Sequence, residues 1–457
     1  MGGLPHRTLW ELAWRHGPVM MLRLGMVPTV VVSSADAARD VLKTHDADCC
    51  SRPDTPGPKR LSYQHKDVAF SPYSEQWRQR RKLLVVELLS KRHVQATWYA
   101  RETEMAKLVS GLVVASVNGQ KPVFMEDHVF GYMDGIIGTV AFGNIYGMEH
   151  LPYKEHFHHV IDDAMVVRSS FSAEDYFPNA FGRLVDRLTG VASLRERVVK
   201  EFDAFFEIML EQAQHHDHEN GCGLIHALVG LMNDDQRSEF RFSRDVIKGI
   251  LTNTYVGAVN TGAVTIIWAM AELVRKPHVL NKVQDEIRTV VGNKERVQQD
   301  DMAKLKYLKM VVMETLRLHP ALPLLVPRET MRHITVCGYD VPAKTRILVN
   351  AWAIGRDPTN WGSNPEEFIP DRFEGMDDMY FNRAQFDFLP FSAGRRMCPG
   401  IDMGVATTEF TLANLLHCFD WELPEGLRSE DMNMDEAGGL TIHKKTPLLL
   451  VPSRYKW

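Results

Sequence analysis

The sequence has little of what marks a secreted, nucleic-acid-binding or repetitive protein. Its six cysteines, in a chain of 457 residues, have neither the spacing of a disulfide framework nor a CxxC pair, so we expect a reducing compartment. No signal peptide or membrane-spanning run opens the chain. A formal net charge of −5 argues against nucleic acid as a partner. We find no internal repeat.

The composition is that of a folded enzyme. Hydrophobic residues make up 45% of the chain and charged residues 24%, which excludes a largely disordered protein. Length alone favours two domains. Residues 21–34 predict β-structure that turns at Pro28, residues 33–45 predict a capped helix, and residues 50–72 predict a long Pro-rich loop. Helical patterns then dominate to about Pro320, and residues 334–354 predict β-structure again.

A ten-residue segment, FSAGRRMCPG, carries the clearest chemical signal. Gly394 permits a tight hairpin, and Gly400 opens a run with helical periodicity. Cys398 is therefore expected just before a helix N-terminus, where N–H groups and the helix dipole stabilise a thiolate. Arg396 is placed to meet a carboxylate, and Phe391 to shield the sulfur. A buried core cysteine in a turn is the alternative, and for a lone cysteine it is the commoner one.

The pattern FxxGxRxCxG resembles that of the cytochrome P450 family, and the resemblance extends over nearly the whole chain. It implies one large, mainly helical domain over residues 1–457 with a small β-rich lobe, in place of two domains. It also implies a haem b held between a long central helix and the cysteine loop, with Cys398 as the proximal iron ligand. By the same resemblance the enzyme uses O2 and electrons from NADPH, delivered by NADPH-cytochrome P450 reductase.

The segments FGNIY, LLVPRETMR and NAWAIGRDP resemble the plant membrane-bound group of the family. Members of that group carry an N-terminal membrane anchor and a proline-rich hinge, and neither opens this sequence. We therefore expect a truncated form or an incomplete gene prediction. The resemblance implies that the parent protein lies on the cytosolic face of the endoplasmic reticulum membrane.

Trp77 and Arg81 lie four residues apart in WRQRRK, so on a helix they share one face and can reach the same anion. Taken alone, an ordinary basic surface helix explains them better. The family resemblance implies that both bind a haem propionate, and that Arg328 in LLVPRETMR is a third such partner.

Glu314 and Arg317 stand at i,i+3 in METLRLHP and can form an ion pair. An exposed pair of this kind would contribute only about 0.5 kcal/mol. The resemblance implies instead a buried structural network that Arg372, in FIPDRF, joins. The glutamate usual before that arginine is Asp371 here.

Residues 243–277 predict a helix of roughly 30 residues, about 45 Å long. Its apolar content permits a transmembrane interpretation, but polar groups in lipid cost free energy unless they are paired. The polar residues in this stretch are Thr252, Asn253, Thr254, Asn260 and Thr261. The segment resembles the family's central helix on the oxygen-binding side of the haem.

In this helix Gly257 and Ala258 would leave room for dioxygen, and Thr261 matches the family's proton-delivering alcohol. Asn260 departs from the usual Asp or Glu, and Gly262 replaces the usual Ser or Thr. An amide orients a water but does not exchange a proton near neutral pH. The departure puts ordinary hydroxylation in question and leaves the haem assignment intact.

Position in the family predicts an apolar substrate pocket, although plain core packing explains an apolar set equally well. The pocket residues would be Phe70, Phe171, Val256, Gly257, Leu322, Leu324, Leu325, Gly439 and Leu440. Segments such as DADCCSRPDTPGPKRLSY and FSAEDYFPNA resemble family members that dehydrate an aldoxime to a nitrile and then hydroxylate the adjacent carbon. They imply a small aromatic metabolite of plant secondary metabolism as substrate.

Three functions stay open at this point. One is a monooxygenase on such a metabolite, aldoxime or unrelated. The second is a haem-thiolate dehydratase or isomerase that needs no oxygen activation, and the third is a haem-binding protein without turnover. An electron donor must dock on the cysteine side of the haem. We therefore expect a basic docking face for an acidic flavoprotein, formed by Arg78, Arg80, Lys82 and Arg395.

Overall fold

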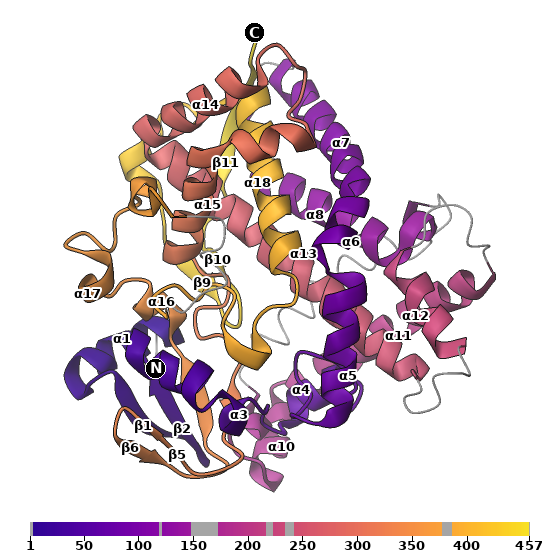
Figure 1. Cartoon of the computed structure of the whole chain (residues 1–457), viewed down its shortest axis with the longest axis vertical. Helices are drawn as coiled ribbons and strands as arrows, with labels where there is room; N and C mark the ends of the chain where they lie inside the picture. The colour runs from indigo at the N-terminus through magenta and orange to yellow at the C-terminus, as the bar shows by residue number, and fades with distance from the viewer. Residues whose placement is uncertain are drawn as a thin grey trace.

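The computed structural model describes residues 3–117, 121–147, 172–215, 223–233, 242–376 and 386–456. Within them a large helical body is joined to a smaller β-rich lobe (Figure 1). The N-terminus lies at the lobe, and the C-terminus lies at the opposite end of the body (Figure 1). This arrangement confirms the predicted mainly helical fold with one β-rich lobe.

The helices come in chain order, with short 3₁₀ and π segments between them. They are α1 (Pro5–His16), α2 (Ala35–Arg39), η1 (Asp40–Thr44), α3 (Asp46–Cys49), α4 (Pro56–Leu61), α5 (Glu75–Leu83), η2 (Leu84–Leu88), α6 (Lys91–Ala96), α7 (Trp98–Val117), α8 (Met125–Phe142), η3 (Gly143–Gly147), η4 (Ala173–Asp175), α10 (Ala180–Leu188), α11 (Val191–His215), α12 (Leu224–Asn233), α13 (Arg244–Arg275), α14 (Pro277–Val291), η5 (Gln299–Lys304), α15 (Lys306–Leu318), α16 (Ala351–Ile354), α17 (Pro358–Trp361), η6 (Pro370–Phe373), η8 (Gly394–Arg396), α18 (Ile401–Cys418) and η9 (Ser429–Asp431).

The strands form four small sheets. They are β1 (Val19–Leu24), β2 (Val27–Val32), β3 (Val123–Phe124), β4 (Arg328–Glu329), β5 (Ile334–Val336), β6 (Tyr339–Val341), β7 (Arg346–Val349), β8 (Phe419–Glu422), β9 (Glu436–Gly438), β10 (Ile442–Lys444) and β11 (Leu449–Arg454). The largest sheet has the order β1-β2-β7-β4, with β2 and β7 parallel. The others pair β5 with β6, β9 with β10, and β3 and β8 with β11. Chain segments more than 300 residues apart therefore meet in the lobe.

Three local predictions need correction. The first hairpin turns at Gly25, where φ is +62°, and Pro28 lies inside β2 opposite Arg23. Glycine adopts such a φ without strain, whereas proline is fixed near −65°, so the turn belongs to the glycine. The predicted loop over 50–72 contains a helix, α4, with proline in its first turn. The predicted β-region over 334–354 ends in a helix, α16, which Asn350 caps.

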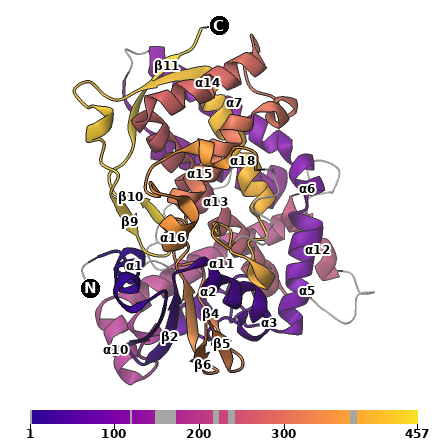
Figure 2. The same ribbon diagram turned by 60° about the vertical axis from the view of Figure 1, so that its left-hand side comes forward.

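The long helix α13 forms the centre of the body. Ser243 caps its N-terminus by accepting a hydrogen bond from the Val246 N–H, as residues of this type do. It contacts α8, α15 and α18, and Figures 1 and 2 both place α18 and α15 beside it. It is the one described helix long and apolar enough to cross a membrane, and its apolar stretch is mostly buried in the protein core.

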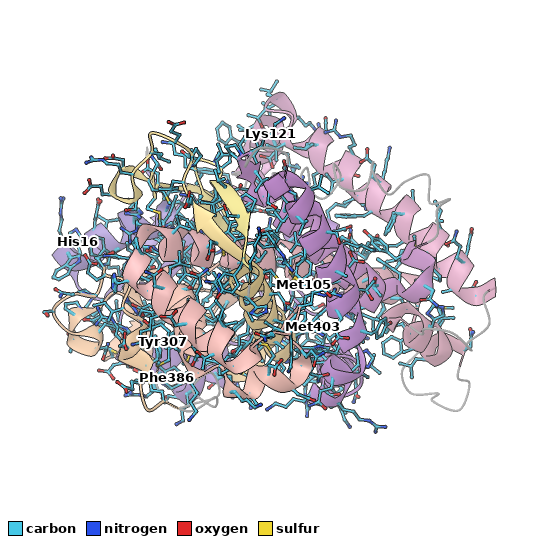
Figure 3. The ribbon with its side chains drawn as sticks, turned by 90° about the horizontal axis from the view of Figure 1, so that it is seen from above. His16, Met105, Lys121, Tyr307, Phe386 and Met403 are labelled. Atoms are coloured by element: carbon cyan, nitrogen blue, oxygen red, sulfur yellow. The ribbon has the colours of Figure 1, made fainter. Side chains whose placement is uncertain are left out.

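Apolar side chains fill the spaces between these helices. The main core includes Leu251 and Val256 of α13 together with residues of α7, α8 and α18. Met105 and Met403, labelled in Figure 3, are almost fully buried and belong to this core. A second, separate cluster fills the β-rich lobe. The helix that carries Gly257 to Thr261 is therefore held rigidly from several sides.

Candidate functional site

The cysteine loop has the geometry that its sequence predicts. The Cys398 N–H donates to the Phe391 carbonyl at 2.9 Å, and α18 begins three residues after the cysteine, with Gly400 at its N-cap. Gly394 has a φ of +70°, and a Cβ there would lie 2.4 Å from the Leu42 carbonyl oxygen. Only glycine fits at this position, because any side chain would meet both strain and backbone.

The sulfur of Cys398 lies between opposing electrostatic influences. Burial raises the pKa of the thiol, while the Gly400 N–H and the Arg81 guanidinium lower it. The residue nevertheless keeps a partly accessible surface. The sulfur is therefore shielded from bulk water, while the partly accessible surface of the residue leaves room for a ligand. A thiolate at this place needs a positive partner, such as a metal ion, to be stable.

Three residues predicted to bind anionic groups converge beside this loop. Arg81 and Trp77 lie on α5, with the guanidinium carbon 5.8 Å from the indole ring. Arg81 donates through Nη2 to the Met397 carbonyl next to Cys398. Arg396 stacks on the other side of the cluster, with its guanidinium carbon 3.8 Å from the Trp77 ring. The shared helix face of Trp77 and Arg81 thus points to the cysteine loop.

The donors of Arg396 are partly used by the protein itself. The guanidinium donates to the carbonyls of Cys50, Val68 and Ser71 at 2.8, 3.2 and 2.7 Å. Burial lowers the pKa of Arg396 to about 9. A guanidinium has five N–H donors, so three such bonds leave two for another acceptor.

Arg328 is held in a similar way on the other side of the loop. It donates to an Asp46 carboxylate oxygen at 2.6 Å and to the Ala393 carbonyl at 2.7 Å. Asp46 also pairs with Arg395 at 2.8 Å. Trp77 in turn donates its indole N–H to the Val68 carbonyl at 2.9 Å.

Sequence reasoning missed one cation of this cluster. Arg52 is 6% exposed, and burial together with the charges of Arg396 and Arg328 holds its pKa well below the usual value. It donates to the carbonyls of Val326 and Pro327 at 2.6 and 2.7 Å, directly before Arg328. Its only sequence signal was a lone arginine in a Pro-rich stretch, which indicates a polar loop.

Four guanidinium groups therefore stand close together beside Cys398: those of Arg52, Arg81, Arg328 and Arg396. Buried like charges are costly unless an anion compensates them. Asp46 and Asp67 act on them electrostatically, so in the described part of the chain cations outnumber these carboxylates. Three of the four are buried and Arg81 is half-buried. A thiol beside this excess of cations fits a haem, which brings both an iron for sulfur and two propionates.

The predicted oxygen-side residues share one face of α13. Gly257 is exposed although its helix is central, and a Cβ built on it would meet nothing within 4 Å. Thr261 donates through Oγ1 to the Gly257 carbonyl at 2.6 Å. The Oδ1 atom of Asn260 is buried and has no hydrogen-bond partner. Open space and an orphaned acceptor on this face leave room for a ligand and a water.

The predicted Glu–Arg network is present, and its central Glu314–Arg317 pair is fully buried. Both side chains of the Glu314–Arg317 pair are 0% exposed, and two hydrogen bonds of 2.6 and 2.7 Å join them. Arg372 approaches Glu314 to 3.4 Å. Arg317 also donates to the carbonyls of Gly355 and Pro365, at 2.6 Å each. The network ties α15 to the segment between α16 and η6.

The residues of the predicted pocket differ in burial and in the apolar cluster to which they belong. Val256 is 1% exposed and belongs to the main core. Leu325 is buried in the core of the β-rich lobe, and Leu324 packs on a third apolar cluster. The half-buried members are Phe70, Leu322, Leu324, Gly439 and Leu440, Gly257 is exposed, and Phe171 lies outside the described residues.

The predicted docking face also needs correction. Arg80 is 5% exposed and donates to the His65 carbonyl at 3.0 Å, so it lies inside the protein. Its position on α5 points it away from Arg78 and Lys82, which are exposed. Arg78 pairs with Glu75 at 2.9 Å. Helical periodicity puts only part of a basic run on the surface, which composition alone does not reveal.

Comparisons with known proteins agree with this geometry. The family model described as cytochrome P450 matches residues 1–451. A 4-hydroxyphenylacetaldehyde oxime monooxygenase of Sorghum bicolor is 57% identical over the whole chain and 86% of the relative. A 2-methylbutanal oxime monooxygenase of Manihot esculenta is 44% identical over the whole chain and 88% of the relative. A zebrafish cytochrome P450 solved with abiraterone has a TM-score of 0.81 at 22% identity, over 99% of this chain and 100% of that one.

Proposed function

Because this chain belongs to the cytochrome P450 family, and is therefore a haem-dependent monooxygenase, we propose that it acts on a small aromatic aldoxime. The reaction would first dehydrate the aldoxime to a nitrile and then hydroxylate the adjacent carbon. The observation that carries the proposal is that two similar relatives, from different plants, are both oxime monooxygenases. The open space beside Gly257 agrees with a ligand on this face of α13.

Cys398 would be the axial ligand of the haem iron. Burial raises the pKa of its thiol, while the helix N-terminus at Gly400 and the nearby charge of Arg81 act in the opposite direction, toward the thiolate. When bound, the haem would activate oxygen, and electron donation from the thiolate would favour this chemistry. Phe391 and Gly394 would shape the loop around the ligand.

The arginines beside the loop would hold the two propionates. Arg81, Arg328 and Arg396 retain N–H donors beyond those that bond to protein groups. Trp77 bonds the Val68 carbonyl, so it would reach a propionate only by exchanging that partner. The excess of buried positive charge supports anion binding at this place.

Asn260 and Thr261 would manage protons on the opposite side of the haem. The unpaired Asn260 Oδ1 would accept a hydrogen bond from a water and hold it near the Thr261 hydroxyl. Thr261 already donates to the Gly257 carbonyl, so its oxygen is left to accept from that water. Neither group exchanges a proton with bulk solvent, unlike the carboxylate usual at position 260.

This arrangement favours a second candidate, a haem-thiolate dehydratase. Dehydration of an aldoxime has no net redox change, since the substrate loses one water and no electrons are consumed. It therefore needs fewer protons delivered to the site than oxygen activation does. Thr261 with a bound water would supply the proton transfer that remains. The amide at Asn260 is the observation that favours it.

The remaining partners follow from the class. NADPH-cytochrome P450 reductase at the endoplasmic reticulum membrane would supply the electrons. Lys82 and Arg78 would take part in docking, since both are exposed on α5 and the neighbouring Arg81 reaches the cysteine loop. Acidic reductase surfaces complement such a patch.

A reconstituted assay tests the proposal. Purified holoprotein is given reductase, NADPH and either 4-hydroxyphenylacetaldoxime or the aliphatic 2-methylbutanal oxime, with and without oxygen. We expect the aromatic oxime to bind with a spectral shift and to give nitrile and then hydroxynitrile in air. Nitrile alone, formed also without oxygen, would select the dehydratase. Turnover of neither oxime, with a normal haem-thiolate spectrum, would contradict the aldoxime assignment.

A further inference from the structure

The dipeptide Val68–Ala69 is bonded in an unusual way. Its two N–H groups both donate to Oδ1 of Asn253, at 2.9 Å each. The Val68 carbonyl accepts from Trp77 at 2.9 Å and from Arg396 at 3.2 Å, and the Ala69 carbonyl accepts from Arg52 at 2.9 Å. Every polar main-chain group of the dipeptide is therefore bonded by a side chain from another part of the fold.

Asn253 contributes a third bond to this segment. Its Nδ2 donates to the Asp67 carboxylate at 3.0 Å, and the same carboxylate accepts from the Phe70 N–H at 3.1 Å. A single carboxamide thus fixes the main chain from Asp67 to Phe70. Since a buried main-chain group left unpaired is costly, these bonds define where Phe70 stands.

The position of Asn253 on α13 places this contact next to the proposed haem-facing side of the helix. Asn253 lies one helical turn before Gly257 and shares a face with it and with Asn260. The open space beside Gly257 is on the same face. The Asp67–Phe70 segment therefore covers the N-terminal end of that face, and Phe70 is half-buried there.

The chain leading into this segment is strained. Tyr63, Gln64 and His65 all have positive φ values, of +50°, +60° and +62°. Non-glycine residues hold such a conformation only where surrounding contacts impose it. Arg80 and Ser71 bond the His65 carbonyl at 3.0 and 2.5 Å. The segment would shift if its attachment to α13 were lost.

We infer that Asn253 is a positioning residue that sets substrate selectivity by holding Phe70 at the edge of the substrate space. This inference rests on the proposed haem site, because the space beside Gly257 is the substrate space only if the haem lies against that face. Asn253 itself would touch neither substrate nor haem. Its effect would pass through the main chain of Asp67 to Phe70.

Two azoles of different size test it in the ferric holoprotein by absorbance titration. Imidazole is too small to reach the edge of the space, whereas 4-phenylimidazole extends toward it. We expect Asn253→Ala to weaken 4-phenylimidazole binding about tenfold and imidazole binding less than about twofold. Phe70 would no longer be held in place, and only the larger probe would contact it. Thr254→Ala is the matched control, since that hydroxyl bonds only its own helix, at Ile250.

Phe70→Ala should give the same selectivity change, and the double variant should be no weaker than either single one. The Phe70→Ala measurement stands even if Asn253→Ala does not load haem. An unchanged ratio of the two affinities in Phe70→Ala, or additive losses in the double variant, would overturn the inference. If the parent protein binds no imidazole and its reduced form shows no carbon monoxide band, the haem site itself is refuted.

Discussion

Neutralising Glu314 should destabilise the protein far more than neutralising any surface carboxylate. In Glu314→Gln the shape is kept, but Arg317 is left as a buried cation that keeps hydrogen bonds to main-chain carbonyls and lies over the Trp361 ring, with no carboxylate partner of its own. Breaking a buried pair in this way costs about 3–5 kcal/mol. A chain of 457 residues loses roughly 1 kcal/mol per degree near its midpoint, so Tm should fall by about 3–5 °C.

Thermal unfolding of the holoprotein, followed by circular dichroism, measures the effect. Asp431→Asn is the matched control, because Arg428 and Asp431 form an i,i+3 pair of the same spacing that is exposed to solvent. Such pairs contribute about 0–1 kcal/mol, so its Tm should change by about 1 °C or less. Equal shifts in the two variants would refute the reasoning that burial makes the Glu314–Arg317 pair structural.

Three further outcomes are expected. Cys398→Ser should abolish the strongly red-shifted Soret band of the reduced carbon monoxide complex, and a retained band would rule out Cys398 as the iron ligand. Asn260→Asp should raise the hydroxylated product formed per NADPH consumed and leave oxime dehydration within about threefold; unchanged coupling would mean that another proton relay operates. Burial alone would raise the pKa of Glu436, but hydrogen bonds from His6 and Arg7 hold it far below its usual value. Glu436→Gln should therefore lower the free energy of unfolding most above about pH 5. The loss should become progressively smaller below about pH 4, where the carboxyl of the unfolded chain is protonated. A pH-independent loss, measured by urea unfolding, would contradict the last expectation.

The sequence predicted those parts of the site that one short segment determines. Gly394, Cys398 and Gly400 lie within one short loop, so their placement follows from local geometry and from the family pattern. The course of α13 followed from the helical pattern of residues 243–277, whereas the cap at Ser243 was found only in the structure. The Glu314–Arg317 pair needed only helical spacing, and its burial needed the family resemblance.

Long-range contacts were not predictable in this way. Arg52 meets Val326 across 274 residues, and no pattern near Arg52 indicates that it is buried. Arg80 was taken for a surface charge because its neighbours are basic, whereas the helix turns it inward to the His65 carbonyl. Asn253 was noticed only as a polar group in an apolar helix. Its partners at Val68 and Ala69 lie 185 and 184 residues away.

The cluster of four guanidinium groups beside Cys398, three of them buried, has a consequence for how the protein is made. Until haem arrives, a newly synthesised chain must bring Arg52, Arg81, Arg328 and Arg396 together with too few negative charges to balance them. Repulsion at low dielectric would keep this region open while the rest of the helical body folds. Supply of the cofactor, more than expression of the chain, would then limit the yield in a foreign host. Feeding the host a haem precursor should increase soluble protein, and haem-starved cells should accumulate chains that proteases cut near residue 52.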